Sequence, residues 1–259
     1  MISKQAYVHP DAKLGANVRV EPFAYISGNV VIGEGSWIGP NSVIMDGARI
    51  GKNCKTFPGA VISAIPQDLK FEGEDSTTEV GDNTIMREGV TINRGTAAKG
   101  KTVVGNNCLL MANSHVAHDC IVGDNCILVN NVGLAGEVVL GDWAILGGGS
   151  AVHQFTHIGS HAMLSGGTML RKDVPPYVMI NHNPIGYMGI NSVGLQRRGF
   201  SKEQIDQIHE IYRVVYQSGK NVSQALEHIK AEFKAGPERD AIVDFISASK
   251  RGIIKAATK

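Results

Sequence analysis

The sequence predicts a mainly β fold, a solenoid of very short stacked strands followed by a small helical domain. Two observations carry this prediction. A six-residue period, with a large aliphatic residue at the first position and a small residue at the fifth, extends from Val8 to Val174 with two interruptions. Beyond Ser201, apolar residues recur at helical spacing instead.

The repeat is regular enough to define the strands. Of 25 six-residue units, 24 begin with an aliphatic residue or Met, and Thr56 is the exception. In every unit except the one at Ile62, the fifth residue is Ala, Val, Ser, Thr or Cys. Positions five and one lie two residues apart across a unit boundary, so their side chains face the same side of a strand. Strands of this kind stack into coils that each contact only their neighbours.

The other positions suit the corners between strands. Gly, Asn and Asp are frequent at positions two to four, and these residues tolerate the positive φ of tight corners. The pattern resembles the hexapeptide-repeat family, which implies a left-handed parallel β-helix with three units in each triangular coil. All four cysteines fall at fifth positions and are predicted to pack inside the coil as small residues: Cys54, Cys108, Cys120 and Cys126.

Two excursions interrupt the repeat, at residues 65–78 and 97–101. Loops on a rigid scaffold commonly carry function, and we expect this of the first excursion. The second is predicted to be a plain solvated loop.

The repeat is predicted to end at Asp173-Val-Pro-Pro-Tyr177, because paired prolines cannot continue a hydrogen-bonded ladder. A linker is predicted from there to about Gly199. The predicted domains are residues 1–190, the β-helix with its excursion near 65–78, and residues 191–259, the helical domain. Three helices are predicted in the helical domain. The first is capped by Ser201 and stopped by Ser218-Gly219. The second carries Ala225, Leu226, Ile229 and Phe233 and ends at Gly236-Pro237, and the third carries Ile242, Phe245 and Ile246.

The composition argues against two classes of partner. The net charge of +1 provides no basic surface for nucleic acid. No apolar run approaches the ~20 residues of a membrane span, and the first residues lack the apolar core of a signal peptide. We therefore expect a cytoplasmic protein without an integral membrane segment.

Residues one coil apart lie above one another at a spacing of about 4.8 Å. The count is unbroken after Val104, so His118, Gly136 and Gln154 form one column. A histidine beside a glycine N–H has the parts that acyl transfer to a hydroxyl needs, a base for the attacking proton and a donor for the oxyanion. Asp119 is placed to orient the imidazole.

Other interpretations of these residues stay open. His118 at a corner could be a surface residue, or it could hold a metal with His115 and His153 across a subunit interface. No Cys or carboxylate triplet lies at ligand spacing, so we expect no metal. The pair Arg197-Arg198 is either solvated or a clamp on phosphate.

Six segments resemble those of the UDP-N-acetylglucosamine acyltransferases of lipid A biosynthesis, and they follow the same order: Gln67-Asp-Leu-Lys70, Ser114-His-Val-Ala-His-Asp119, Leu134-Ala-Gly136, Val152-His-Gln-Phe155, Asp173-Val-Pro-Pro-Tyr177 and Arg197-Arg-Gly-Phe200. The resemblance spans nearly the whole chain. It implies transfer of a 3-hydroxyacyl group from acyl carrier protein to the 3-hydroxyl of UDP-N-acetylglucosamine, the first step of that pathway. It also implies a homotrimer with sites between subunits, and no cofactor, since the acyl donor arrives on the phosphopantetheine arm of acyl carrier protein.

The resemblance also implies roles for individual residues. His118 is the general base, Asp119 its support and Gly136 the oxyanion donor. The substrate cleft is lined by Asp68, Lys70, His115, Glu137, His153 and Gln154, and Asn191, Arg197 and Arg198 lie near the nucleotide or the carrier arm. Two positions depart from the pattern. Glu137 stands where several members have a sugar-contacting histidine, and Val193 where some have a glutamate, which leaves open an acceptor with a 3-amino group.

A second column predicts the length of the acyl chain. It consists of outward-pointing residues at position six: His115, Gly133, Ala151 and Met169. Two coils almost without side chains leave a groove of about 14 Å beside His115, and Met169 fills its end. In the family this region measures acyl length, so Met169 is expected to limit the chain to on the order of ten to twelve carbons. The alternative is that Met169 packs against a neighbouring subunit.

Leu109, Ile127 and Ile145 also occupy position six, and such apolar outward residues predict a subunit interface. A triangular prism favours a trimer. Three other functions stay open. They are the related N-acyltransferase, a zinc-dependent hydratase and a non-catalytic solenoid. The expected absence of an extra domain before the repeats argues against the N-acyltransferase.

Overall fold

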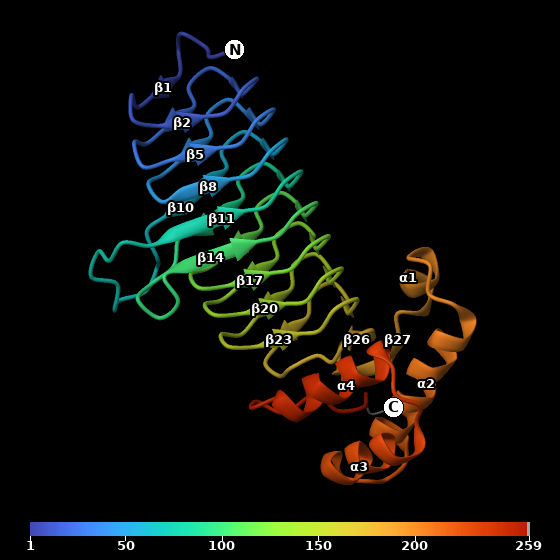
Figure 1. Ribbon diagram of the computed structural model, residues 1–259. Helices are drawn as coiled ribbons and strands as arrows, with labels where there is room; N and C mark the ends of the chain where they lie inside the picture. The colour runs from blue at the N-terminus through green and yellow to red at the C-terminus, as the bar shows by residue number, and fades with distance from the viewer. Residues whose placement is uncertain (258–259) are drawn as a thin grey trace.

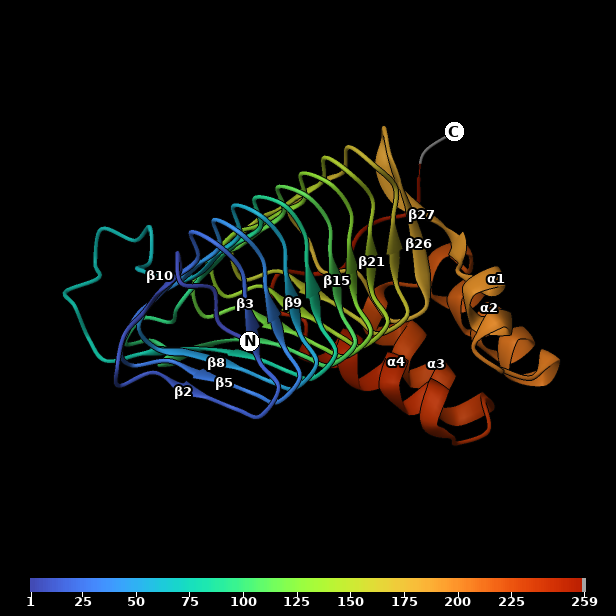
Figure 2. The same cartoon turned by 90° about the horizontal axis from the view of Figure 1, so that it is seen from above.

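The computed structural model describes residues 1–257 and shows a long triangular prism with a helical domain at its C-terminal end (Figure 1). Three sheets form the walls of the prism, and each coil contributes one strand to each wall. Seen from above, the coils stack one behind another along the prism axis (Figure 2). The predicted left-handed parallel β-helix with C-terminal helices is confirmed.

The strands are mostly two residues long, and within residues 1–257 they form three sheets. The nine-stranded sheet contains β1 (Tyr7–Val8), β4 (Tyr25–Ile26), β7 (Val43–Ile44), β10 (Val61–Ala64), β13 (Thr91–Asn93), β16 (His115–Val116), β19 (Gly133–Leu134), β22 (Ala151–Val152) and β25 (Met169–Leu170). The eight-stranded sheet contains β2 (Lys13–Leu14), β5 (Val31–Ile32), β8 (Ala48–Ile50), β11 (Thr77–Val80), β14 (Lys101–Val104), β17 (Ile121–Val122), β20 (Val139–Leu140) and β23 (His157–Ile158). The ten-stranded sheet contains β3 (Arg19–Val20), β6 (Trp37–Ile38), β9 (Lys55–Thr56), β12 (Ile85–Met86), β15 (Leu109–Leu110), β18 (Ile127–Leu128), β21 (Ile145–Leu146), β24 (Met163–Leu164), β26 (Val178–His182) and β27 (Ile185–Ile190).

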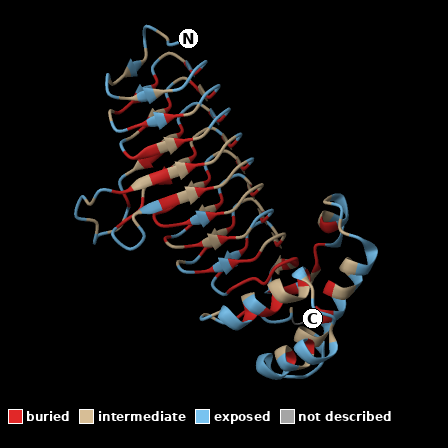
Figure 3. Ribbon diagram, viewed as in Figure 1, coloured by how far each residue is buried: buried red, intermediate tan, exposed pale blue. Residues whose placement is uncertain are grey.

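Side-chain burial follows the six-residue period. Residues at positions one and five fill the interior, and residues at position six face outward (Figure 3). All four cysteines are buried, as predicted. The corners use positive φ at position four, at Asn107 and Asn125 as expected, and also at the bulky Trp143 (63°) and His161 (61°). The side chain at position four therefore lies on the edge of the prism, whatever the residue type.

The ladder continues past the two prolines, so the prediction that it ends there is wrong. Strand β26 pairs in parallel with β24, with Met179 opposite Met163, and then in an antiparallel hairpin with β27. Pro175 and Pro176 lie in the corner before β26, where no ladder N–H is required. The segment predicted as a linker is therefore this hairpin followed by helix α1 (Ser192–Arg197).

The helical domain contains α2 (Lys202–Gln217), α3 (Val222–Glu232) and α4 (Pro237–Ala248). Ser201 and Gln204 form the predicted capping box, and α2 ends at Ser218 as expected. Phe233 lies just beyond α3, and Pro237 begins α4 rather than ending α3, because a proline in the first turn needs no N–H partner. The division between domains at residue 190 stays a prediction.

The chain after α4 returns to the prism. Ser249 Oγ donates to Asp173 Oδ2 at 2.6 Å, and the Asp173 N–H donates to the carbonyl of Gly252. Asp173 is buried, so this docking is sheltered from water. It places Arg251 beside the last coils.

Candidate active site

One corner of the prism gathers the candidate catalytic residues. His118 lies between β16 and β17, where the chain passes from the nine-stranded to the eight-stranded sheet. The carbonyls of His118 and Gly136 accept backbone N–H groups from Glu137 and Phe155 in the next coils, at 3.0 and 3.2 Å. The predicted column of His118, Gly136 and Gln154 is thus confirmed. Both excursions leave the coil at this same corner.

His118 and Asp119 form a buried pair. His118 Nδ1 lies 2.8 Å from Asp119 Oδ2, and the two residues are 9% and 0% exposed. An ionised carboxylate only accepts hydrogen bonds, so Nδ1 carries the ring proton and Nε2 keeps its lone pair. Asp119 itself is at a corner with φ of 60°. The pair therefore has the tautomer that a general base at Nε2 requires.

The shorter excursion is exposed, as predicted for a solvated loop, but together with Thr96 before it, this loop also binds Asp119. The backbone N–H groups of Thr96 and Lys99 donate to Asp119 Oδ1, and Thr96 Oγ1 donates to Oδ2. Lys99 Nζ donates to the Asp119 carbonyl at 3.2 Å. Thr96 and Lys99 were not predicted as site residues: Thr96 occupies a fifth position and resembles ordinary interior packing.

Gly136 lies directly against the imidazole. A Cβ at this position would stand 2.5 Å from both Cε1 and Nε2 of His118, closer than a carbon can approach without displacing the ring. No acceptor among residues 1–257 takes the Gly136 backbone N–H. The glycine thus leaves room for the imidazole and has an N–H group that no acceptor of the described chain occupies.

The longer excursion brings an acid to the other side of the ring. Asp68 Oδ2 lies 3.9 Å from His118 Nε2, and Asp68 Oδ1 accepts the backbone N–H of Lys70. Asn93 Nδ2 donates to the carbonyl of Ile65, which anchors the start of this loop. Asp68 is thus within reach of a substrate hydroxyl at Nε2, whereas the Lys70 side chain is exposed.

His115 and Glu137 lie near this pair but are already engaged. His115 Nδ1 lies 2.7 Å from Thr91 Oγ1, and burial, then the nearby His118, lowers the pKa of His115 below its ordinary value. Glu137 Oε2 lies 3.9 Å from Lys99 Nζ. In the next coil, the exposed His153 has its Nδ1 3.2 Å from an Arg251 guanidinium nitrogen.

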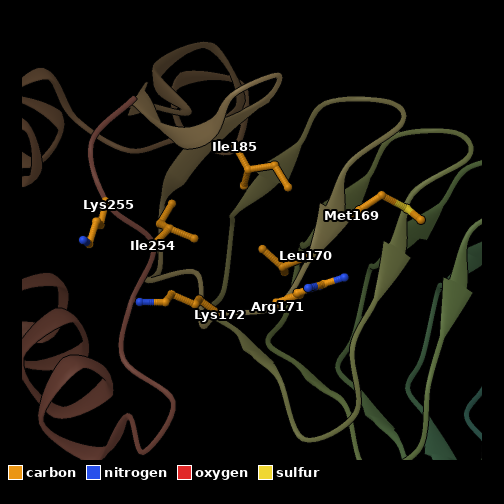
Figure 4. A pocket seen from close by; sticks show the side chains of 7 residues that line it. All are labelled: Met169, Leu170, Arg171, Lys172, Ile185, Ile254 and Lys255. Atoms are coloured by element: carbon orange, nitrogen blue, oxygen red, sulfur yellow. The ribbon is translucent and has the colours of Figure 1, made fainter. Parts of the chain in front are cut away.

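The second predicted column is confirmed by the strand register, which places His115 opposite Gly133, Gly133 opposite Ala151, and Ala151 opposite Met169. Two hollows adjoin its far end. One, of about 170 Å³, is lined by Ala151, Val152, His153, Met169, Leu170 and Arg171. The other, of about 390 Å³, is lined by Met169, Leu170, Arg171, Lys172, Ile185, Ile254 and Lys255 (Figure 4).

Met169 stands between these two hollows. Its side chain is 62% exposed and extends toward the preceding coils, away from Ile185 and Ile254 (Figure 4). The hollow beyond it has an apolar floor of Leu170, Ile185 and Ile254. The groove is therefore narrowed at Met169 but does not end there.

The basic pair lies on a different wall. A hollow of about 690 Å³ on the ten-stranded sheet is lined by Trp143, Ile145, Met163, Met179, Asn191, Val193, Gly194, Arg197 and Arg198. Asn191 is buried, accepts the Gly194 N–H that caps α1 and donates to the His161 carbonyl. Both polar ends of its side chain are thus used within the chain, which fixes the helix that carries Arg197.

Arg198 is held by aromatic rings. Its guanidinium lies 5.0 Å from the centre of the Trp143 ring and 3.3 Å from His161 Nδ1. Burial and the charge of Arg198 lower the pKa of His161 to about 4, so His161 is neutral at pH 7. Trp143 and His161 were not predicted as site residues, although they stand one coil apart at position four.

Two further findings bear on the expected partners. Within residues 1–257 no group of three or more His, Cys, Asp or Glu side chains is arranged to hold a metal ion. No helix of the described chain has the length and apolar composition needed to cross a membrane.

Comparison with known proteins places the chain. Residues 173–254 match the family described as UDP N-acetylglucosamine O-acyltransferase, domain 2, and residues 29–64 and 101–136 match the bacterial transferase hexapeptide repeats. An acyl-[acyl-carrier-protein]–UDP-N-acetylglucosamine O-acyltransferase of Sulfurihydrogenibium is 55% identical over the whole chain and 96% of its own length. The chain belongs to the UDP-N-acetylglucosamine acyltransferase family. A relative of the same description from Chlorobaculum parvum is 62% identical over 75% of this chain and 74% of its own.

Solved structures of the family agree with this assignment. The UDP-N-acetylglucosamine acyltransferase of Bacteroides fragilis matches with a TM-score of 0.97 and 55% identity over 98% of this chain and all of its own. The enzyme of Francisella novicida matches with a TM-score of 0.97 and 41% identity over the whole chain. The family resemblance inferred from the sequence is confirmed, and with it the expectation of an acyltransferase.

Proposed function

We propose that this enzyme transfers a 3-hydroxyacyl chain from acyl carrier protein to the 3-hydroxyl of UDP-N-acetylglucosamine, the first step of lipid A biosynthesis. The observation that carries the proposal is the buried His118–Asp119 pair directly against Gly136, at the start of an outward groove. The names of the relatives supply the substrates.

The reaction needs one base and one oxyanion donor. His118 Nε2 takes the proton of the sugar 3-hydroxyl while that oxygen attacks the thioester carbonyl. The Gly136 N–H stabilises the oxyanion of the tetrahedral intermediate. When the intermediate collapses, the C–S bond breaks and the leaving phosphopantetheine sulfur takes the proton from Nε2. Asp119 stabilises the imidazolium that forms in between.

The surroundings of Glu137 favour a hydroxyl acceptor over an amine. A free carboxylate would suit an acceptor that carries a 3-amino group, but Glu137 is paired with Lys99. Its charge is therefore compensated within the chain. The carboxylate that would have suited an amine acceptor is thus already paired within the chain, and the relatives are O-acyltransferases by name.

A complete site requires a second copy of the chain. The base stands at the edge of the nine-stranded wall, whereas Arg197 and Arg198 lie over the ten-stranded wall. We propose a homotrimer in which the nine-stranded wall of one subunit faces the ten-stranded wall of the next. The nucleotide would then bind near the arginines while its sugar reaches His118, with Asp68, Lys70, His115, His153 and Gln154 lining the cleft.

The acyl chain is proposed to lie along Gly133 and Ala151. Both positions carry almost no side chain, and Met169 narrows the path beyond them. An apolar groove of about 14 Å suits an acyl chain on the order of ten to twelve carbons. Acyl carrier protein delivers this chain, so the enzyme needs no cofactor of its own, and we place it in the cytoplasm with that donor.

Mass spectrometry of the product tests the function. Wild-type enzyme, UDP-N-acetylglucosamine and 3-hydroxyacyl carrier thioesters should give the 3-O-acylated nucleotide sugar. His118→Ala should lower kcat by roughly 10²–10⁴, the range for general acid–base groups, with the fold kept. His209→Ala, an exposed position on α2, is the matched control. Wild-type-like turnover in His118→Ala, or a product acylated elsewhere, would contradict the proposal, and metal analysis of active enzyme separates it from a zinc hydratase.

A further inference from the structure

The carboxylate of Asp119 has four hydrogen-bond donors. Oδ1 accepts the backbone N–H groups of Thr96 at 3.0 Å and Lys99 at 3.2 Å. Oδ2 accepts the Thr96 hydroxyl at 2.6 Å and His118 Nδ1 at 2.8 Å. One oxygen atom is therefore shared between Thr96 and the proposed base.

The direction of the Thr96 hydroxyl is fixed by its own environment. Thr96 Oγ1 accepts the backbone N–H of Ala98 at 3.2 Å, which leaves its proton for Asp119. Thr96 is buried. An oriented, buried hydroxyl donating to an ionised carboxylate is a strong hydrogen bond, because the acceptor is charged.

The loop that carries Thr96 is braced by the longer excursion. Ser76 Oγ donates to the Gly95 carbonyl at 2.6 Å, and Glu74 Oε1 accepts the Ala97 N–H at 2.9 Å. Both interruptions of the repeat thus support one another at the corner that holds the pair. Such support is typical of groups that must hold a reacting side chain in place.

We propose that Thr96 is a positioning residue for acyl transfer, whose hydroxyl fixes the Asp119 carboxylate and thereby sets the orientation and basicity of His118. The inference rests on the proposed role of His118 as base. Thr96 occupies a fifth position of the repeat, where most residues only fill the interior. Thr96 acts only through Asp119 and touches no reacting atom.

The sign of the effect follows from the shared oxygen. A hydrogen bond from Thr96 disperses negative charge on Oδ2, so removing it leaves more charge to stabilise the imidazolium of His118. The pKa of His118 should therefore rise, and the acidic limb of the kcat/KM profile should move to higher pH. Loosening Asp119 should also lower kcat, because the ring is held less firmly.

Other charged groups face His118, and the test leaves them unchanged. Asp68 lies 3.9 Å from Nε2, and His115 is close enough for the two rings to influence one another. Lys99 and Glu137 pair with each other beside the Asp119 carbonyl. Thr96→Val alters none of these side chains and keeps the Thr96 N–H, so a shift reports the lost hydroxyl.

The experiment compares Thr96→Val and Thr96→Ser with Thr102→Val in the intact enzyme. Thr102 Oγ1 accepts the backbone N–H of Asp119 at 2.8 Å, so its loss disturbs the same residue without touching the carboxylate. The readouts are kcat and KM, the kcat/KM pH profile, and the pKa of His118 from NMR titration of protein labelled at histidine Cε1. The resonance missing in His118→Ala assigns the signal.

We expect Thr96→Val to lower kcat about tenfold with KM little changed and to raise the His118 pKa by about half a unit or more. Thr96→Ser should restore both values. Thr102→Val should lower Tm without moving the His118 pKa. If Thr96→Val does not fold, Thr96→Ala serves in its place with the same expectations.

An unmoved His118 pKa with a lowered Tm in Thr96→Val would overturn the inference, since Thr96 would then be merely structural. So would a failure of Thr96→Ser to restore kcat and the pKa. The NMR titration needs no substrate. If wild type forms no 3-O-acylated sugar, the proposed function fails, while the titration still decides whether Thr96 controls His118.

Discussion

Gly136 lies one coil from His118, so close that a Cβ on the glycine would stand 2.5 Å from Nε2 of the imidazole. The glycine therefore serves the site in two ways. It leaves its N–H accessible, and it makes the space in which the His118 imidazole lies. A larger side chain at position 136 would remove the space for the imidazole but keep the backbone N–H, so a substitution can separate the two roles.

Gly136→Ala should reduce kcat by roughly two orders of magnitude or more, because the methyl group displaces the His118 ring from its partner Asp119. The backbone N–H remains in this variant. Steady-state kinetics and NMR of the His118 imidazole would follow the two effects. Gly236→Ala is the matched control, since the nearest atom to an added Cβ at that position lies at 3.9 Å. A fully active Gly136→Ala enzyme with an undisturbed ring would show that the contact is irrelevant.

Met169→Gly should shift the preferred substrate to longer acyl chains with little change in affinity for the sugar nucleotide. Removing the side chain joins the hollow beside Ala151 to the one floored by Ile185 and Ile254. The test measures kcat/KM for 3-hydroxyacyl carrier thioesters of graded length. Met188→Gly, at another exposed methionine on β27, should keep the wild-type profile. If the Met169→Gly and wild-type profiles superimpose, Met169 does not limit the length of the acyl chain.

The stability of the protein should fall in mild acid because of His161. Its pKa is about 4 in the folded chain, below the ordinary value of about 6.5. Between these two values the unfolded chain binds a proton that the folded chain does not, so stability decreases as the pH falls through this window. Denaturant unfolding at pH 7, 6 and 5, at one protein concentration, should show a smaller loss in His161→Gln than in wild type. Equal losses in both proteins would refute the assignment, and His209→Gln controls for an exposed histidine.

Sedimentation equilibrium tests the proposed trimer. Ile127→Lys places a charge on the ten-stranded wall, where Leu109, Ile127 and Ile145 form an outward apolar row, and should dissociate the assembly. Ile121→Lys makes the same change on the eight-stranded wall, which carries charged residues such as Arg49, Glu79 and Lys101. It should leave a trimer. A wild-type monomer at micromolar concentration would exclude the assembly.

Much of the fold could be predicted because, in a solenoid, neighbouring residues of successive coils are separated by a fixed number of residues. Once the six-residue period is known, residues one coil apart are neighbours, and the columns through His118 and His115 follow without any tertiary information. The capping box at Ser201 is likewise local. Predictions failed where a residue has two compatible uses. Proline can end a ladder or occupy a corner, and it can follow a helix or begin one, as Pro237 does.

The six-residue repeat specifies the scaffold, the burial of position-one and position-five residues, and the contact of His118 with Gly136, because a periodic chain repeats one set of contacts. The roles of the two interruptions become visible only in the folded chain. The two excursions lie outside the period and have no fixed neighbours, so nothing in the sequence places Asp68 at His118 or the Lys99 N–H on Asp119. The pairing of Lys99 with Glu137 is of the same kind, since a long-range ion pair depends on where both backbones end up.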